Sequence, residues 1–185
     1  MATRNRHNRV VVVGGGIGGV ATAAALRSGG YAGEIVILDR AEFPYDRPPL
    51  SKDYLSGKRD LKEIALQQQD WYVAHRIDVI GPVEVTTLAA NDECVTVVLA
   101  DGRECIADQV VLATGGRAAR PPIQGSESGR VHVLRDVADA DALRAVLVPG
   151  ARLLVVGGGL IGAEVASTAR AWALASCSSI RSTHR

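Results

Sequence analysis

The chain has 185 residues, of which 47% are hydrophobic, 22% charged and 4% aromatic, and its formal net charge is +1. This composition is typical of a globular protein with enough chain to bury a core. The small charge and scarce aromatic residues argue against a nucleic-acid partner, which needs clustered cations and stacking rings. No segment of the sequence is long and apolar enough to span a membrane, so we expect no membrane partner.

The three cysteines, Cys94, Cys105 and Cys177, form no CxxC pair. Their spacing predicts neither a metal site nor a disulfide framework. We therefore expect no bound metal and a location in the reducing cytoplasm.

Four elements follow one another near the start of the chain. They are a valine strand, a glycine-rich turn, an alanine-rich helix and a second β-branched strand, at residues 10–13, 14–19, 20–27 and 34–38. The turn has the spacing GxGxxG at Gly14, Gly16 and Gly19. In this context Gly14 allows the tight turn, Gly16 lets a pyrophosphate approach the backbone, and Gly19 lets the helix pack against the sheet.

The N–H groups of Ile17 and Gly18 lie at the start of the predicted helix, where the dipole favours an anion. Asp39 follows the second strand, 20 residues after Gly19, where a carboxylate can accept hydrogen bonds from a ribose diol. A glycine-rich turn between core elements is the simpler alternative. Because the strand, helix, second strand and acid are all present, the stretch predicts a dinucleotide site.

Prolines at positions 44, 48 and 49 exclude regular structure before Leu50, and Pro49 predicts a helix over about 50–55. Arg47 and Lys52 flank this turn, and taken alone they are solvated cations on a surface loop. The six residues from Arg47 to Lys52, RPPLSK, resemble a signature of FAD-dependent, NAD(P)H-linked ferredoxin reductases, a family that includes rubredoxin and putidaredoxin reductases. The resemblance implies that the first fingerprint binds FAD, and that Arg47 and Lys52 lie beside the flavin, with Lys52 in a catalytic position.

The next stretch predicts a short helix, a strand, three antiparallel strands and a further buried strand. Their ranges are 70–74, 77–80, 83–88, 93–99, 104–106 and 110–113. Asp101-Gly102 is a hairpin signal between two of the antiparallel strands. This order resembles the FAD domain of the same family, which implies that the backbone at Val85 contacts the adenine end of FAD.

Ala113, Thr114 and Gly115 end the last of these strands, and alone they are a common strand-ending turn. By the resemblance they form the second FAD motif of the family. Arg135 likewise matches an arginine that reaches FAD in the family, although alone it is a solvated charge.

A helix over 136–147 and a strand over 152–156 lead into a second GxGxxG, at Gly157, Gly159 and Gly162, with a helix over 165–171 behind it. Two fingerprints in one chain predict two dinucleotide sites. The resemblance implies that the second binds NAD(P)H through Gly157, Gly159, Leu160, Ile161, Gly162 and Glu164. Glu164 is then catalytic, near the nicotinamide and Lys52. The alternative is that Glu164 is simply an acidic residue in the first turn of a helix, where the helix dipole favours a negative charge.

After Ala171 the pattern of the family stops, and no Asp or Glu follows Glu164. We expect no strand there and interpret residues 172–185 as an aberrant tail of a truncated reading frame. The domains predicted are an FAD-binding domain over 1–125 that lacks its C-terminal return segment, and the start of an NAD(P)-binding domain over 126–171.

The predicted fold is α/β: a three-layer FAD/NAD(P)-binding Rossmann-like domain with an antiparallel β-meander, followed by the start of a second Rossmann-like unit. The resemblance implies an FAD-dependent oxidoreductase that passes electrons from NAD(P)H to an iron–sulfur carrier, a ferredoxin or rubredoxin. The alternative is a truncated, non-catalytic FAD-binding fragment. A metabolite-sensing module would also fit the glycines, but it leaves RPPLSK unexplained.

Overall fold

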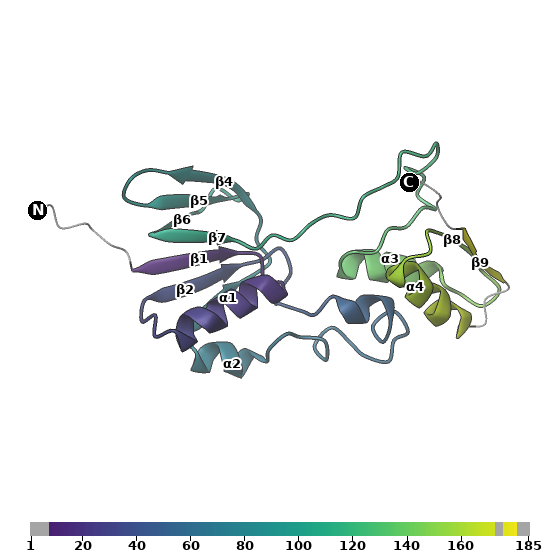
Figure 1. The fold of residues 1–185 in the computed structure, drawn as a ribbon, viewed down its shortest axis with the longest axis horizontal. Coiled ribbons are helices and arrows are strands. Elements are labelled where there is room, and N and C mark those ends of the chain that lie inside the picture. Colours follow the sequence, from purple (N-terminus) through teal and green to yellow (C-terminus); the bar gives the residue numbers. More distant parts are fainter. Residues whose placement is uncertain (1–7, 173–175, 181–185) are drawn as a thin grey trace, which may run out of the picture. The chain divides into compact units, whose positions relative to one another are not determined.

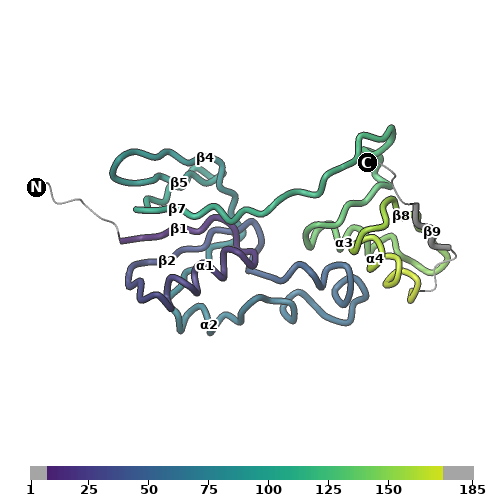
Figure 2. The backbone as a smooth tube through the Cα atoms, in the orientation of Figure 1, coloured from purple at the N-terminus to yellow at the C-terminus, as the bar shows by residue number. Residues whose placement is uncertain are grey.

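The computed structural model describes residues 8–172 and 176–180, and the chain forms two compact units (Figure 1). The first unit combines the residues up to Asp46 with Ala65–Gly115, and the second combines Arg47–Ile64 with the residues from Gly116 onward. Figure 2 lets the reader follow the chain as it leaves the first unit and returns to it. The predicted boundaries at residues 125 and 171 refer to nucleotide-binding functions and stay predictions.

A four-stranded parallel sheet forms the centre of the first unit. Its strands are β1 (Arg9–Val13), β2 (Glu34–Leu38), β3 (Ile77–Ile80) and β7 (Gln109–Leu112), in the order β3-β2-β1-β7. Val13 pairs with Leu38 on one side and with Leu112 on the other, so the carboxyl ends of these strands meet at one edge. The strands predicted from β-branched runs are confirmed to within a residue or two.

Two helices, α1 (Ile17–Ser28) and α2 (Gln69–Ala74), cover one face of this sheet (Figure 1). Because strand side chains alternate between faces, Val10 and Val12 of β1 point to the helices. There they pack with Val20 and Ala23 of α1 and with Tyr72 of α2.

The other face is covered by an antiparallel meander of β4 (Val85–Ala90), β5 (Val95–Leu99) and β6 (Glu104–Ala107). Val11 and Val13, the alternate residues of β1, pack there with Val97, Leu99 and other apolar side chains. Helices, parallel sheet and meander make three layers, which confirms the fold class predicted from the sequence.

The segment between β2 and α2 departs from the prediction. The helix predicted over 50–55 is wrong: only a 3₁₀ turn, η1 (Pro48–Ser51), forms, followed by irregular turns. Lys52 has φ −121° and ψ −107°, which are not helical values, and the N–H of Tyr54 reaches back to the carbonyl of Pro49. Proline favours the first turn, but it cannot impose the following residues' dihedrals.

The second unit contains α3 (Val137–Val146), β8 (Arg152–Val156), α4 (Leu160–Arg170) and β9 (Ser176–Ile180). A capping box between Asp136 and Asp139 begins α3. The core of the unit is formed by buried apolar side chains of α3 and its C-cap residue, of α4, and of the segment after η1, namely Leu55, Leu143, Leu147, Val165 and Ala169.

The expectation of no strand after Ala171 is wrong for 176–180. β9 pairs in parallel with β8, from Arg152 with Ser176 to Val156 with Ile180, and completes a β–α–β unit around α4. The sequence SCSSI carries little β-propensity, so the pairing follows from the open edge of β8 and the return of the chain along α4. The rest of the predicted tail, except Trp172, lies outside the described residues.

Candidate functional site

The first glycine turn joins β1 to α1 in a conformation that needs glycine. Gly14 has φ +110°, and its N–H donates to the carbonyl of Leu38 at 2.8 Å. A Cβ on Gly14 would overlap the carbonyl of Ala113, and one on Gly19 would overlap the carbonyl of Gly14. The steric reasons predicted for Gly14 and Gly19 therefore hold, while their contact with a cofactor stays a prediction.

The N-terminus of α1 faces open space. Gly16 is the N-cap in extended conformation, and among the described residues no side chain caps the helix and no acid lies in its first turn. Ile17 is 70% exposed, and a Cβ on Gly18 would meet no atom within 4 Å. Uncapped N–H groups and a positive dipole end make this a place where an anion can bind.

Asp39 lies where β2 ends, and its carboxylate already holds the turn together. One oxygen accepts a hydrogen bond from the N–H of Gly15, and the other accepts one from the N–H of Ala41 at 2.9 Å. A Cβ on Gly15 would overlap the Asp39 carboxylate. Gly15 thus has a structural role in the turn that the spacing GxGxxG does not single out.

The other residues of the first unit predicted to bind FAD follow neighbouring strands. The N–H of Ala113 donates to the carbonyl of Val13 at 2.8 Å, Thr114 is exposed, and Gly115 has φ +69°. Val85 begins β4 beside a bulge and packs against the core. Two residues earlier, the N–H of Val83 donates to the carbonyl of Asp39. The structure thus gathers the glycine turn, Asp39 and 113–115 at the carboxyl edge of the sheet, where ligands of such sheets bind.

The second glycine turn, between β8 and α4, repeats the first. Gly157 has φ +109°, and Gly159 is an extended N-cap with φ −78° and ψ 179°, against −71° and −178° for Gly16. A Cβ on Gly162 would come within 2.7 Å of the Gly157 carbonyl oxygen. The same spacing therefore builds the same turn twice.

Two apolar residues begin α4 and are turned to solvent. Leu160 is 83% exposed and Ile161 is 55% exposed. Among the described residues no side chain caps this helix either. The N–H groups of its first turn are therefore uncapped. The binding role that the resemblance implies for Leu160 and Ile161 stays a prediction.

Glu164 of α4 binds the RPPLSK segment at two points. The Lys52 Nζ lies 3.1 Å from Glu164 Oε1, and the Ser51 hydroxyl donates to Glu164 Oε2 at 2.5 Å. The Ser51 donor, followed by Lys52, holds the pKa of the Glu164 carboxyl below its ordinary value. The two residues predicted to be catalytic, Lys52 and Glu164, are therefore brought together as an ion pair.

Two residues of this cluster were missed by the sequence analysis. Ser51 lies inside RPPLSK but was given no role, and Thr168 donates its hydroxyl to the Ser51 carbonyl at 2.9 Å. Thr168 comes four residues after Glu164 on α4, so the two share a helix face. This spacing was the one signal in the sequence that could have found it.

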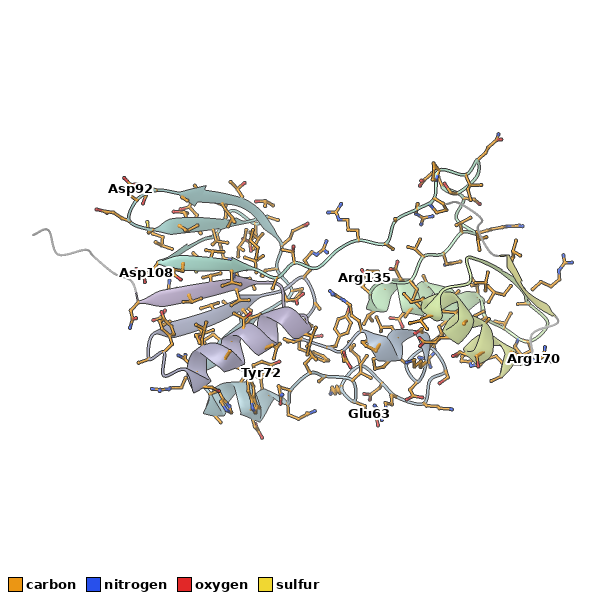
Figure 3. The ribbon with its side chains drawn as sticks, viewed as in Figure 1. Glu63, Tyr72, Asp92, Asp108, Arg135 and Arg170 are labelled. Carbon is orange, nitrogen blue, oxygen red and sulfur yellow. The ribbon has the colours of Figure 1, made fainter. Side chains whose placement is uncertain are left out.

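The two arginines predicted to bind FAD both belong to the second unit. Arg47 is half-buried at the start of η1, and its carbonyl accepts from the N–H of Leu50 at 2.9 Å. Arg135, labelled beside α3 in Figure 3, donates from Nε to the carbonyl of Gly116 at 3.0 Å. Its backbone N–H donates to the carboxylate of Asp139. The contact of either arginine with FAD stays a prediction.

Within 8–172 and 176–180, no group of three His, Cys, Asp or Glu side chains could hold a metal ion. No helix in the same residues is long and apolar enough to cross a membrane. Cys94 and Cys105 are free and half-buried.

A parallel sheet between helices and a meander, with a GxGxxG turn at the end of β1 and another at the end of β8, defines a dinucleotide-binding α/β protein. Residues 8–178 match the family model of the pyridine nucleotide-disulphide oxidoreductases. The chain belongs to this family, whose members bind FAD and use NAD(P)H.

Curated relatives are ferredoxin and rubredoxin reductases, which confirms the resemblance found in the sequence. Putidaredoxin reductase of Pseudomonas putida is 41% identical over 169 residues, covering 89% of this chain and 40% of that protein. The ferredoxin–NAD(+) reductase subunit of a benzene 1,2-dioxygenase system from the same species is 42% identical, with 88% and 39% covered. A Pseudomonas putida rubredoxin–NAD(+) reductase is 38% identical, with 86% and 41% covered.

Solved structures agree with this assignment. The covalent complex of putidaredoxin reductase with putidaredoxin matches with a TM-score of 0.80 and 38% identity, over 94% of this chain and 42% of that one. A ferredoxin reductase of Rhodopseudomonas palustris matches with a TM-score of 0.83 and 28% identity, over 92% and 42%. The chain spans about 40% of the length of the curated relatives it matches.

Proposed function

We propose that the chain binds FAD at the first glycine turn and NAD(P)H at the second, and that it serves electron transfer from NAD(P)H to a ferredoxin or rubredoxin type carrier. The observation that carries the proposal is the repeated turn. Gly14 and Gly157 share one left-handed backbone conformation, and Gly16 and Gly159 share one extended N-cap. Two such turns provide for two dinucleotides in one chain.

The residues at the first turn fit FAD. The turn admits no side chain at Gly14, Gly15 or Gly19, because a Cβ there would overlap neighbouring protein atoms. These glycines therefore keep the tight turn that brings the backbone to a pyrophosphate. The N–H groups of Ile17 and Gly18 are oriented for that anion. Asp39 uses one lone pair of each oxygen within the protein, and a carboxylate has further lone pairs for ribose hydroxyls.

At the second turn, the N–H groups of Leu160 and Ile161 would hold the pyrophosphate of NAD(P)H in the same way. Glu164 lies in the first turns of the helix that begins there and pairs with Lys52, which follows η1. We assign this pair to the nicotinamide side of the coenzyme. FAD held at the first turn would supply the redox chemistry that links a hydride donor to a one-electron acceptor.

The carrier and the location belong to the same proposal. The names of the relatives include ferredoxin–NAD(+) reductase and rubredoxin–NAD(+) reductase, which supports an iron–sulfur protein as the electron acceptor. The free, half-buried Cys94 and Cys105 are consistent with the reducing cytoplasm.

Visible absorption spectroscopy tests the proposal. The purified chain is titrated with FAD, freed of excess ligand, and then treated with NADH or NADPH without oxygen. A bound flavin spectrum that bleaches on addition of either coenzyme is expected. A bound flavin that does not bleach contradicts the NAD(P)H half of the proposal, and a chain that retains no flavin contradicts the FAD half.

A further inference from the structure

Helix α4 binds both the side chain and the backbone of Ser51. Ser51 is 4% exposed. Its hydroxyl donates to Glu164 at 2.5 Å, and its carbonyl accepts from the Thr168 hydroxyl at 2.9 Å. Because Glu164 and Thr168 lie one turn apart on a single helix face, α4 fixes the side chain and the backbone of the same residue.

This attachment determines where the next side chain lies. Lys52 follows Ser51, and its N–H donates to the Pro49 carbonyl at 2.9 Å, so its backbone is tied to η1. Its ammonium, on a side chain that is 51% exposed, reaches the Glu164 oxygen that Ser51 leaves free. An exposed lysine–carboxylate pair alone gains little, because two flexible side chains must be ordered. Here Ser51 has already ordered the carboxylate.

We propose that Thr168 and Ser51 are positioning residues, which hold η1 on α4 so that the Lys52 ammonium and the Glu164 carboxylate keep a fixed arrangement beside the second glycine turn. Thr168 acts through the Ser51 carbonyl, and Ser51 acts through the carboxylate. The positioning stands on the contacts within the second unit. Its catalytic consequence, a lysine held ready for the nicotinamide coenzyme, rests on the proposed function.

Apolar packing offers a competing explanation for the place of η1, because Leu50 is 2% exposed and Leu55 lies in the core of the unit. The two explanations predict different results for a variant that keeps the apolar packing but loses the Thr168 hydroxyl. Thr168→Val keeps the branched shape of the side chain but has no donor. Thr168→Ser keeps the donor and loses the methyl group.

Limited trypsin digestion of the full chain measures the attachment without any cofactor. Cleavage after Lys52 requires the turn to open, so its rate follows the opening equilibrium. We expect cleavage to be roughly three- to tenfold faster in Thr168→Val, as for the loss of one net hydrogen bond, and unchanged in Thr168→Ser. Cleavage after Arg103, in the β5–β6 hairpin of the first unit, is the internal control and stays constant.

A wild-type rate after Lys52 in Thr168→Val overturns the role of Thr168. The role of Ser51 is tested by Ser51→Ala, with the Glu164 carboxyl carbon followed by NMR through a pH titration. We expect the titration to move to higher pH because the hydroxyl donor is lost, and an unmoved titration overturns the role of Ser51. Circular dichroism shows whether each variant keeps its helices, and the Thr168 pair carries the test if Ser51→Ala does not fold.

The catalytic consequence has a separate measurement. In chain loaded with FAD, the rate of bleaching by NADH should fall in Thr168→Val and recover in Thr168→Ser, while FAD affinity stays the same. Equal bleaching rates combined with faster cleavage would limit the attachment to a structural role and overturn the catalytic half. A chain that binds no FAD would contradict the proposed function, whereas the digestion experiment would still test the positioning role.

Discussion

The hydroxyl of Tyr72, labelled in Figure 3, is buried with no hydrogen-bond partner among the described residues. The side chain is 3% exposed and packs from α2 against the parallel sheet. A buried hydroxyl without a partner loses its hydrogen bonds to water and gains none in the protein, which lowers the stability of the folded state. We therefore expect Tyr72→Phe to leave the free energy of unfolding unchanged or to raise it by about 1 kcal/mol, measured by urea denaturation.

Tyr54 supplies the matched control, because its hydroxyl donates to Asp141 at 2.8 Å. The same change there, Tyr54→Phe, should lower the free energy of unfolding by about 1 kcal/mol. A loss of similar size in Tyr72→Phe would mean that the Tyr72 hydroxyl has found a partner, such as a buried water.

The same hydroxyl makes a prediction for alkaline pH. Burial raises the pKa of Tyr72 to about 12, whereas an unfolded tyrosine titrates near pH 10. Below pH 10 the tyrosine is neutral in both the folded and the unfolded state, so its ionisation does not affect stability. Between pH 10 and 12 it ionises in the unfolded state first, and the free energy of unfolding falls as pH rises. Wild type should therefore lose up to about 1.4 kcal/mol per pH unit more than Tyr72→Phe in that window, measured by urea denaturation at each pH. Parallel pH profiles would contradict the prediction.

Glu164 makes the opposite prediction for acid pH. Its pKa is lowered by the Ser51 hydroxyl and then by Lys52, from an ordinary value of 4.5. A depressed folded pKa gives stability that is present above 4.5 and is lost as pH falls through the folded pKa. In Glu164→Gln, the trypsin cleavage rate after Lys52 should already be raised at pH 7. Hydrogen exchange of residues 48–52 should depend on pH between 3 and 5 in wild type and lose that dependence in the variant.

At the scale of elements, the N-terminus of α1 can be tested with two side chains of equal size. A Cβ at Gly18 meets no atom within 4 Å, so both Gly18→Asp and Gly18→Asn should fold. The aspartate suits the helix dipole but repels a pyrophosphate. We expect FAD affinity to fall at least about tenfold in Gly18→Asp and to stay within about threefold of wild type in Gly18→Asn, measured by flavin fluorescence titration.

Equal affinities in the two variants would mean that no phosphate lies at this helix. A loss in both would point to crowding by the side chain. Thermal denaturation without FAD separates these outcomes from misfolding, because Gly18→Asp should be at least as stable as Gly18→Asn.

Elements with strong local signals were predicted well. β2 was placed to the residue, because a run of β-branched side chains between glycines and an acid has few other structures available. β9 was missed because four of its five residues are Ser or Cys, and only the edge of β8 makes it a strand. The helix predicted over 50–55 gives way to the short η1, because a proline favours a first turn but does not fix the dihedrals of Lys52, which are not helical.

The glycine turns were predicted in detail because their constraints are local in sequence. The pairing of Lys52 with Glu164 came from the resemblance to a family, since the two residues are far apart in the chain. Ser51 and Thr168 escaped prediction because a serine and a threonine carry many possible hydrogen bonds. Only the fold decides which of those bonds are made.

At the scale of the molecule, each of the two units is built from segments that are not continuous in sequence. Residues 47–64 leave the first unit after β2 and supply Leu55 to the core of the second unit, where this side chain is fully buried with Leu143, Leu147 and Val165. The second unit therefore cannot complete its core from the residues after Gly116 alone.

Leu55→Ala tests this division. A buried leucine cut to alanine costs about 2–5 kcal/mol, and the cost should fall on the second unit. Hydrogen exchange followed by mass spectrometry should speed up in peptides from α3 and α4, while peptides from β1 and β2 keep wild-type rates. Ile37→Ala, a fully buried residue of β2, should give the reverse pattern. If either variant speeds exchange equally in both units, the chain opens as one cooperative body, and the division into two units describes contacts without describing stability.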